Sequence, residues 1–260
     1  MTDTRNAMRL LDGLADPLLA PVLTLPPGAH VVQLACGTGG LSLALARRRA
    51  DLRITAVDID PGVLRIARAA AADEDLPVDF RAMSMAGLDF GDGSADAVIS
   101  RMGLLMPGTA PFDLAAREAA RILRPGGILS VATWTDLAAS PYTGFGLPVL
   151  RRLLPEGAVP DFNQVFAASA RPGALEGHLA AAGLVDVDAS WFRWEAEYPS
   201  FEDWWAFDTG FGPLKALFDS LDDRQLAEAR RAMTDDISVH RTESGGYRLP
   251  ATCRLISARR

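Results

Sequence analysis

The stretch VVQLACGTGGLSLALARRRADLRITAVDID, residues 31–60, decides the fold. Its hydrophobic pattern predicts a short apolar strand, a glycine turn, a helix and a second strand that ends at Asp58. Gly37, Gly39 and Gly40 let the backbone turn tightly and approach a ligand that a side chain would block. Asp58 follows these glycines by about twenty residues, the spacing at which a carboxylate can hold ribose hydroxyls. The unit therefore predicts a site for a nucleoside-containing cofactor.

Composition limits the class of protein. The 260 residues can bury a full core, and 26 Lys and Arg against 33 Asp and Glu give a net charge of −7. Such an acidic chain is a poor candidate for binding nucleic acid, and no apolar run reaches the roughly 18 residues of a membrane span. Cys36 and Cys253 lie too far apart in sequence to suggest a metal site, and no secretory signal is visible, so we expect a cytoplasmic protein. A monomer and a homodimer both stay open.

Beyond Asp58, helical and strand patterns alternate. Asp60-Pro61 predicts a helix N-terminus, with Asp60 as the cap. The further elements are expected at 78–82 (strand), 95–102 (strand), 111–123 (helix, ended by Pro125-Gly126-Gly127) and 128–133 (strand). This rhythm predicts a doubly wound, mostly parallel sheet with helices on both faces. In such sheets a ligand lies beyond the carboxyl ends of the strands, where the strand order reverses.

The remaining segments do not continue this alternation of strands and helices. An N-terminal helical arm is expected over about 1–27, with a break at Asp16-Pro17. Proline and glycine in about 136–168 suggest a lid, and about 201–234 suggests a helical excursion. Residues 185–198 predict a long strand whose inward side changes near Trp191-Phe192, and alternation from Tyr247 to Ser257 predicts a final strand. We expect residues 1–260 to form one domain.

The order of these pieces resembles the class I S-adenosylmethionine-dependent methyltransferases, especially the small-molecule branch related to ubiquinone-biosynthesis C-methyltransferases. The resemblance covers roughly residues 30–260. It is carried by VVQLACGTG (31–39), AVDIDPGVLRIAR (56–68), LDFGDGSADAVISRMGLL (88–105) and AARILRPGGILSVATW (119–134). It implies a Rossmann-like, seven-stranded sheet whose last strand, YRLPATCRLISAR, is antiparallel. It also implies S-adenosylmethionine as cofactor.

The resemblance assigns cofactor-binding residues position by position. Residues at the end of the first strand would wrap the methionine end, those after the second would hold ribose and adenine, those after the third would lie beside adenine, and those after the fourth would line the space near the sulfonium. In chain order these are Ala35, Cys36, Gly37 and Gly39; Asp58 and Ile59; Ser84 and Met85; and Ser100, Arg101 and Met102. Arg101 could pair with a carboxylate of cofactor or acceptor, or be a surface arginine.

Three positions depart from the family pattern. Gln33 stands where an acidic residue is usual, and Ala35 replaces the first glycine of the usual trio. Ser84 stands where an Asp commonly reaches the adenine amino group, and a hydroxyl accepts a hydrogen bond more weakly than a carboxylate does. Asp58 is the acidic anchor that is kept.

Acceptor recognition is expected from aromatic residues that follow a strand's carboxyl end, namely Trp134, Tyr142 and Phe145. His30 and His178 are not placed to act as a base, and His240 lies in a polar run before the last strand from which it could face the cleft. No general base and no metal site are assigned. Methyl transfer from a sulfonium depends mainly on alignment and needs a base only if the acceptor must lose a proton early.

These observations favour methyl transfer to an O, N or C nucleophile of an apolar small molecule, in a specialised-metabolite pathway for instance. A first alternative keeps the cofactor but catalyses a rearrangement or cyclisation without methyl transfer, and Gln33 and Ser84 motivate it. A second alternative is an NAD-dependent oxidoreductase, although Ser42 stands where that class has glycine or alanine.

Overall fold

The computed structural model describes residues 8–106, 110–134, 146–161, 164, 166, 171–210 and 214–260. The chain divides into two compact units. One comprises residues 14–135, 167–192 and 253–260, here called the sheet unit, and the other comprises 1–13, 136–166 and 193–252, here called the helical unit. The boundaries fall inside β6 (Val185–Tyr198) and β7 (Tyr247–Arg259), so each strand contributes to both units. The expectation of a single domain stays a prediction.

A seven-stranded sheet in the order β3-β2-β1-β4-β5-β7-β6 organises the sheet unit. The first five strands are β1 (His30–Leu34), β2 (Arg53–Asp58), β3 (Val78–Ala82), β4 (Ala95–Arg101) and β5 (Leu123–Thr133). Neighbours among these five pair in parallel, whereas β7 pairs antiparallel with β5. The strand order reverses between β1 and β4, the place where such sheets bind ligands. The Rossmann-like fold predicted from the sequence is confirmed.

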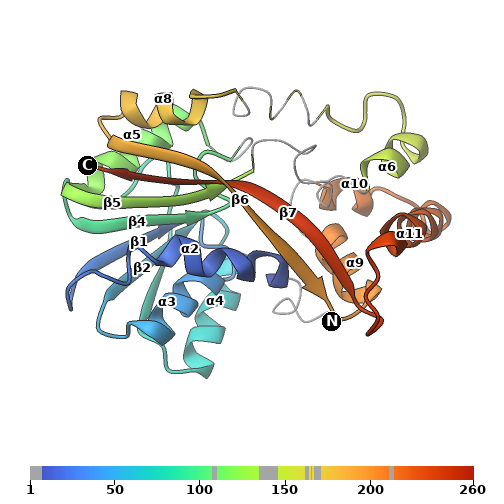
Figure 1. The fold of residues 1–260 in the computed structure, drawn as a ribbon, viewed down its shortest axis with the longest axis horizontal. Helices are drawn as coiled ribbons and strands as arrows, with labels where there is room; N and C mark the ends of the chain where they lie inside the picture. The colour runs from blue at the N-terminus through green and yellow to red at the C-terminus, as the bar shows by residue number, and fades with distance from the viewer. Residues whose placement is uncertain are drawn as a thin grey trace. The chain divides into compact units, whose positions relative to one another are not determined.

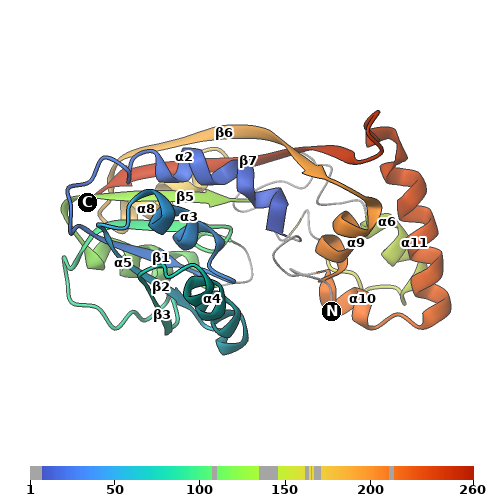
Figure 2. The same cartoon turned by 90° about the horizontal axis from the view of Figure 1, so that it is seen from below.

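Helices cover both faces of this sheet (Figures 1 and 2). Figure 1 shows α2 (Ala15–Leu19), α3 (Gly40–Arg48) and α4 (Pro61–Asp73) on one face, with α5 (Phe112–Ile122) and α8 (Ala174–Ala181) on the other. Small side chains let α5 approach the sheet closely, since four alanines of α5 are buried there with the leucines of α8. A separate cluster packs α4 against β2 and β3, around Phe80 and Leu64.

The helical unit contains most of η1 (Met8–Leu14), together with α6 (Leu147–Leu153), α9 (Phe201–Gly210), α10 (Lys215–Asp219), α11 (Asp223–Ile237) and η3 (Ser238–His240). The segment at about 201–234, for which a helical excursion is predicted, contains α9, α10 and most of α11. Asp222 begins α11 with a capping box, because its side chain accepts from the Gln225 N–H and the Gln225 side chain accepts in return. Trp204 is fully buried, as expected for an aromatic residue that packs this unit.

Two local predictions were wrong in detail. No break falls at Asp16-Pro17; both residues lie in the first turn of α2, where proline removes no helical hydrogen bond. The residues Pro125-Gly126-Gly127 do not precede β5 but lie inside it. The pairing with β4 shifts register there, from Ala95 opposite Leu123 to Ala97 opposite Ile128, so the predicted turn is an irregularity within a longer strand.

The predicted change of side along β6 agrees with the observed burial. Val187 and Ala189 are the less exposed residues in the first half, whereas Ala196 and Tyr198 are buried in the second. Trp191 is exposed between the two halves. Alternating exposure therefore changes phase near Trp191 and Phe192, as the hydrophobic pattern indicated.

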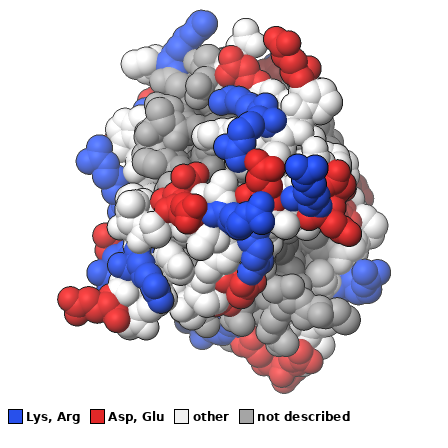
Figure 3. All heavy atoms as spheres, turned by 90° about the vertical axis from the view of Figure 1, so that its right-hand side faces the viewer, with Lys and Arg blue, Asp and Glu red and all other residues white. Residues whose placement is uncertain are grey.

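Charged side chains of both signs are mixed on the face shown in Figure 3, where no broad basic patch is visible. Within the described ranges, no helix is both long and apolar enough to cross a membrane.

Candidate functional site

The loop that follows β1 is the centre of the candidate site. Ala35, Gly37 and Gly39 all have positive φ angles, of 51°, 56° and 85°. A Cβ added at Gly37 would meet no atom of a described residue within 4 Å, whereas one added at Gly39 would approach Ala67 and the Phe80 ring at 3.1 Å. The two glycines therefore have different structural roles. Gly37 leaves the turn open to a ligand, and Gly39 lets the start of α3 pack against α4 and β3.

The carboxylate of Asp58 faces this loop. Its Oδ2 accepts a hydrogen bond from the backbone N–H of Gly37 at 2.8 Å, and its Oδ1 accepts one from Asp60 at 3.1 Å. Asp60 instead caps α4 through the Gly62 N–H, with Pro61 at the first helical position, as predicted. The structure thus brings the glycine turn and the acidic residue together, although they are 21 residues apart in sequence.

Residues after β2 and β3 lie on the same edge of the sheet, because parallel strands end together. Ile59 is 73% exposed, which leaves an apolar side chain open beside Asp58. The Ser84 hydroxyl accepts from the Ala86 N–H at 3.2 Å, so it shapes a turn. Met85 packs against the core cluster on the α5 face, which makes its side chain partly structural.

The end of β4 is attached to the end of β1 through Ser100. The Ser100 hydroxyl donates to the Leu34 carbonyl at 3.0 Å and accepts from the Leu104 N–H at 2.8 Å, and the residue is fully buried. Met102 follows with a positive φ of 59°, and its N–H donates to Ala132. Ser100 therefore supports the loops that would surround a ligand, and its hydroxyl is engaged in doing so.

Arg101 is not a surface arginine, since only 8% of the residue is exposed. A Cβ added at Gly40, the first residue of α3, would lie 2.8 Å from a terminal guanidinium nitrogen of Arg101. The guanidinium thus lies at the N-terminus of α3, where free backbone N–H groups and the helix dipole already favour an anion.

The structure adds two features that the sequence did not predict, the close contact between Gly103 and Ala35 and the burial of Gln33. A Cβ added at Gly103 would lie only 2.2 Å from the Ala35 methyl group, so the glycine makes room for the alanine that replaces the family's first glycine. Gln33 is 1% exposed, and its Oε1 accepts no hydrogen bond from a described residue. A polar residue within the apolar run VVQL was the available signal for Gln33, and nothing local indicated Gly103.

The Cys36 side chain points into the core beside Leu43 and Leu64. Burial, and then the nearby Asp58 carboxylate, raise the pKa of the Cys36 thiol to about 12. The thiol is therefore neutral at physiological pH, and any contact of Cys36 with a ligand is made by its backbone. Cys36 and Cys253 are both free and buried.

His30 is structural, as the sequence indicated. Its N–H donates to Asp96, and its ring nitrogens bond Ser94 and Thr55, at the amino ends of the strands. Burial lowers the pKa of His30. His178 packs edge-on against Phe112, and His240 lies in η3. Among the described residues no group of His, Cys, Asp and Glu is arranged to hold a metal ion.

Of the predicted acceptor residues, Trp134 follows β5 at the carboxyl edge of the sheet. Tyr142 and Phe145 lie outside the described residues. Assignment of an acceptor pocket to these three therefore stays a prediction.

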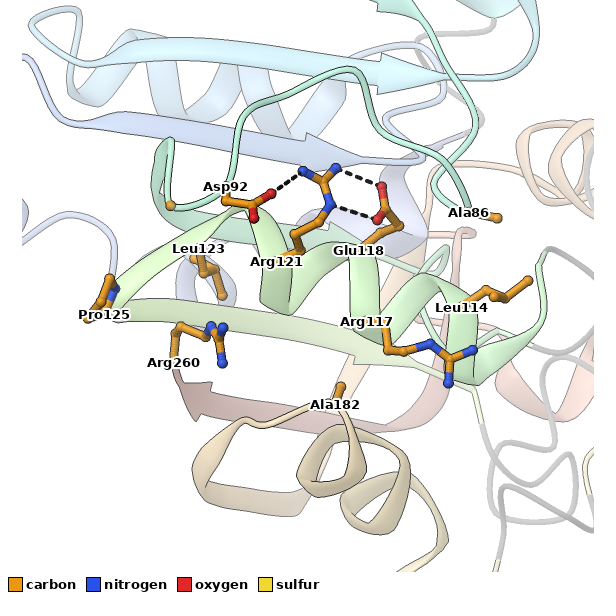
Figure 4. A pocket seen from close by; sticks show the side chains of 11 residues that line it. Ala86, Asp92, Leu114, Arg117, Glu118, Arg121, Leu123, Pro125, Ala182 and Arg260 are labelled. Atoms are coloured by element: carbon orange, nitrogen blue, oxygen red, sulfur yellow. Dashed lines mark hydrogen bonds and ion pairs between the residues drawn. The ribbon is translucent and has the colours of Figure 1, made fainter.

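A groove of about 670 Å³ runs along α5, and Figure 4 shows its lining, which includes no residue of the glycine turn. Arg121 lies across it and is fully occupied, because it pairs with Glu118 and Asp92 and donates to the carbonyls of Leu88 and Phe90. These contacts fix the segment before β4. We therefore assign a structural role to this part of the groove, in which Arg121 holds the segment before β4 in place.

Fold and site together define a nucleoside-binding domain of the Rossmann-like class. A family model described as a methyltransferase domain matches residues 31–127. The chain is 34% identical over 173 residues to the ubiquinone biosynthesis O-methyltransferase of Xanthomonas campestris, covering 65% of this chain and 68% of that protein. The chain therefore belongs to the class I S-adenosylmethionine-dependent methyltransferases, as the resemblance implied.

A second relative is the 2-methyl-6-phytyl-1,4-hydroquinone methyltransferase of Synechocystis, 34% identical over 174 residues. The match covers 66% of this chain but only about half, 51%, of that enzyme. The family membership does not favour the NAD-dependent alternative.

Solved structures share the fold at low sequence identity. YcgJ of Bacillus subtilis superposes with a TM-score of 0.62 at 13% identity, covering 95% of this chain and 98% of that one. The cyclase SpnF superposes with a TM-score of 0.58 at 22% identity, covering 95% and 80%. Because one of these two proteins is named as a cyclase, the fold alone does not specify the reaction.

Proposed function

We propose that this protein transfers a methyl group from S-adenosylmethionine to an O, N or C nucleophile of an apolar small molecule. The observation that carries the proposal is the Asp58 carboxylate facing the open glycine turn at Gly37, within a chain of this family. A ribose held between the two would find a carboxylate acceptor on one side and a backbone without a side chain on the other.

The residues present fit such a cofactor. No described residue fills the space at Gly37 where a side chain would project, and Ile59 exposes an apolar surface beside Asp58 on which adenine can pack. Gln33 offers a buried oxygen that accepts no hydrogen bond from a described residue, and Arg101 offers a cation at the methionine end. Each of the three expected contacts, with ribose, adenine and amino acid, therefore has a candidate residue.

When bound, the cofactor supplies a methyl group activated by the sulfonium. The protein's part is to hold that group in line with the acceptor and to exclude water, and orientation of this kind accounts for several kcal/mol in enzymes. Because no described histidine lies at the glycine turn, we assign no general base. Acceptors whose nucleophile is already ionised, or easily ionised, suit this site best.

For the acceptor we propose a phenol or hydroquinone with an apolar substituent, in specialised or quinone metabolism. The names of two relatives support this, since one is a phytyl-hydroquinone methyltransferase and the other an O-methyltransferase of ubiquinone biosynthesis. The relative from ubiquinone biosynthesis is named as an O-methyltransferase, whereas the resemblance seen in the sequence was to the C-methyltransferases of that pathway. We place the reaction in the cytoplasm, where two unpaired cysteines such as Cys36 and Cys253 stay reduced.

The test is incubation with methyl-labelled S-adenosylmethionine and a panel of alkylated catechols and hydroquinones. We expect label in an organic product with at least one acceptor, and loss of that label in the Asp58→Ala variant. Calorimetry with S-adenosylhomocysteine and with NAD should show binding of the first alone. Binding of NAD alone would contradict the proposal.

One alternative keeps support. The fold of the cyclase SpnF and the departures at Gln33 and Ser84 are compatible with cofactor binding without methyl transfer. Tight binding of S-adenosylhomocysteine, with a rearranged and unlabelled product, would favour that alternative.

A further inference from the structure

We propose that Arg101 and Gln33 form an unequal pair of contacts for the amino-acid end of the cofactor, a charged contact for the carboxylate and a neutral one for the ammonium. The inference rests on the proposed function, because it assigns groups of the same ligand. It predicts a specificity: the site should depend strongly on the cofactor's carboxylate and weakly on its ammonium.

The strand register places the two side chains on one face of the sheet. Gln33 of β1 lies opposite Ile99 of β4, and Arg101 follows Ile99 by two residues. Because side chains alternate along a strand, Arg101 and Gln33 project from the same face. The neighbouring residues Val32, Leu34 and Val98 belong to the core on the other face. Gln33 and Arg101 thus share the face that carries α3.

Arg101 has the placement expected for a carboxylate partner. Its guanidinium lies against Gly40 at the first turn of α3, next to the open turn at Gly37. The guanidinium carries five N–H donors, and its forked geometry matches a carboxylate. The helix N-terminus adds to the same preference for negative charge.

Gln33 supplies the complementary half. Its Oε1 is buried and accepts no hydrogen bond from a described residue. Buried polar atoms of folded proteins are rarely left in that state unless a ligand or water completes them. An amide oxygen can accept from an ammonium, but it lacks the charge of the acidic residue usual in this family. The ammonium therefore gains less here than the carboxylate does.

The experiment compares four ligands by calorimetry with the full chain: S-adenosylhomocysteine, its decarboxylated analogue, its deaminated analogue, and methylthioadenosine, which lacks the whole amino-acid end. With the wild-type protein we expect loss of the carboxylate to weaken binding about 10–100-fold, and loss of the ammonium only about 2–10-fold. A larger loss for the ammonium than for the carboxylate would overturn the inference.

Arg101→Gln should weaken S-adenosylhomocysteine about 10–100-fold while leaving methylthioadenosine and the decarboxylated analogue within about twofold of wild type. Arg101→Lys keeps the charge without the fork, so it should lie between the two. Arg117→Gln removes an exposed positive charge from α5, on the opposite face, and should change none of the affinities. Equal weakening of all four ligands by Arg101→Gln would mean a structural role and overturn the inference.

Gln33→Leu tests the neutral contact. It should remove the small difference between S-adenosylhomocysteine and its deaminated analogue, without altering the effect of the carboxylate. If Arg101→Gln does not fold, by circular dichroism, the wild-type ligand series still decides the question. If the wild-type protein binds methylthioadenosine but is indifferent to the carboxylate, this inference fails and the proposed function stands. If it binds none of the four ligands, both fail.

Discussion

The side chain of Asp58 accepts a hydrogen bond from the backbone N–H of Gly37 at 2.8 Å. This contact joins the end of β2 to the turn after β1, so the carboxylate is held at the mouth of the glycine turn. A ligand's ribose can compete for the same oxygen or share it, because a carboxylate offers about four acceptor positions.

Asp58→Ala should weaken the binding of S-adenosylhomocysteine by about 1–3 kcal/mol, the usual cost of losing a charged hydrogen-bond partner. Calorimetric titration of wild type and variant measures this change in binding free energy. Asp60→Ala is the matched control, because Asp60 lies two residues away and its side chain caps α4, whereas its bond to Asp58 is made by the backbone N–H, which the substitution keeps. The Asp60→Ala variant should lose about 1 kcal/mol of folding stability, with little change in its affinity for S-adenosylhomocysteine. Equal affinity losses in the two variants would contradict our assignment of Asp58.

The contact between Ala35 and Gly103 gives a second prediction. A Cβ on Gly103 would lie 2.2 Å from that of Ala35, far inside the roughly 3.5–4.0 Å of a normal carbon contact. Gly103→Ala should therefore destabilise the fold by about 1–3 kcal/mol through overpacking. The backbone at Gly103 lies outside the left-handed region, so the contact alone opposes a side chain there.

Ala35→Gly should rescue Gly103→Ala. It removes the colliding methyl group and relieves the positive φ of 51°, which costs an L-residue about 1–2 kcal/mol. Urea unfolding of both single variants and of the double variant measures the coupling between the two sites. Additive losses would show that the two residues do not compete for one space.

These two contacts show how far the sequence could lead. The glycine turn, Asp58 and the Asp60 cap were predictable, because their signals lie in local spacing and in helix chemistry. The change of side in β6 was predictable from alternation alone. The contact between the loops that follow β1 and β4 was not predictable, since Ala35 and Gly103 are 68 positions apart in the sequence. A replacement that looks weakening in isolation, alanine for glycine at 35, is compensated by a glycine elsewhere.

The dependence of structure on contacts between distant residues also explains the two wrong predictions. Proline and glycine at 125–127 have the composition of a turn, but pairing of Leu123 with Ala95 extends the strand through them. Asp16-Pro17 has the composition of a break, but the helix begins just before it, and a proline in a first turn is harmless. In both places the position of an element's end, which tertiary contacts set, decided the outcome.

Ser100 gives a third prediction, because its hydroxyl connects the Leu34 carbonyl and the Leu104 N–H. Ser100→Ala should cost about 1–3 kcal/mol of stability by leaving buried groups unpaired, and should also weaken cofactor binding by loosening both loops. Ser130→Ala is the matched control: that hydroxyl is also buried in the sheet, where it donates to the Leu18 carbonyl. It should lose stability without losing affinity. If both variants bind the cofactor as tightly as wild type does, our assignment of Ser100 to the site is wrong.

The helical unit carries a buried carboxyl group, Asp208 of α9. Its Oδ2 accepts no hydrogen bond from a described residue, and it lies 3.4 Å from where a Cβ of Gly146 would be. Burial raises the pKa of Asp208 to about 7. The folded protein therefore keeps this proton at pH values where the unfolded chain has lost it. The folded state is favoured while the group is protonated, and that advantage disappears as the pH rises toward 7.

Unfolding free energy should accordingly fall by roughly 2–4 kcal/mol between pH 4 and pH 8 because of this one group. Asp208→Asn cannot ionise, so it should remove that component of the pH dependence and leave the variant relatively more stable at pH 8. Urea unfolding at a series of pH values measures the difference between the two proteins. Asp236→Asn, an exposed carboxylate on α11 of the same unit, is the control and should follow the wild-type curve. A parallel pH dependence in wild type and Asp208→Asn would mean that the carboxyl group is ionised in the folded protein and that its surroundings admit water.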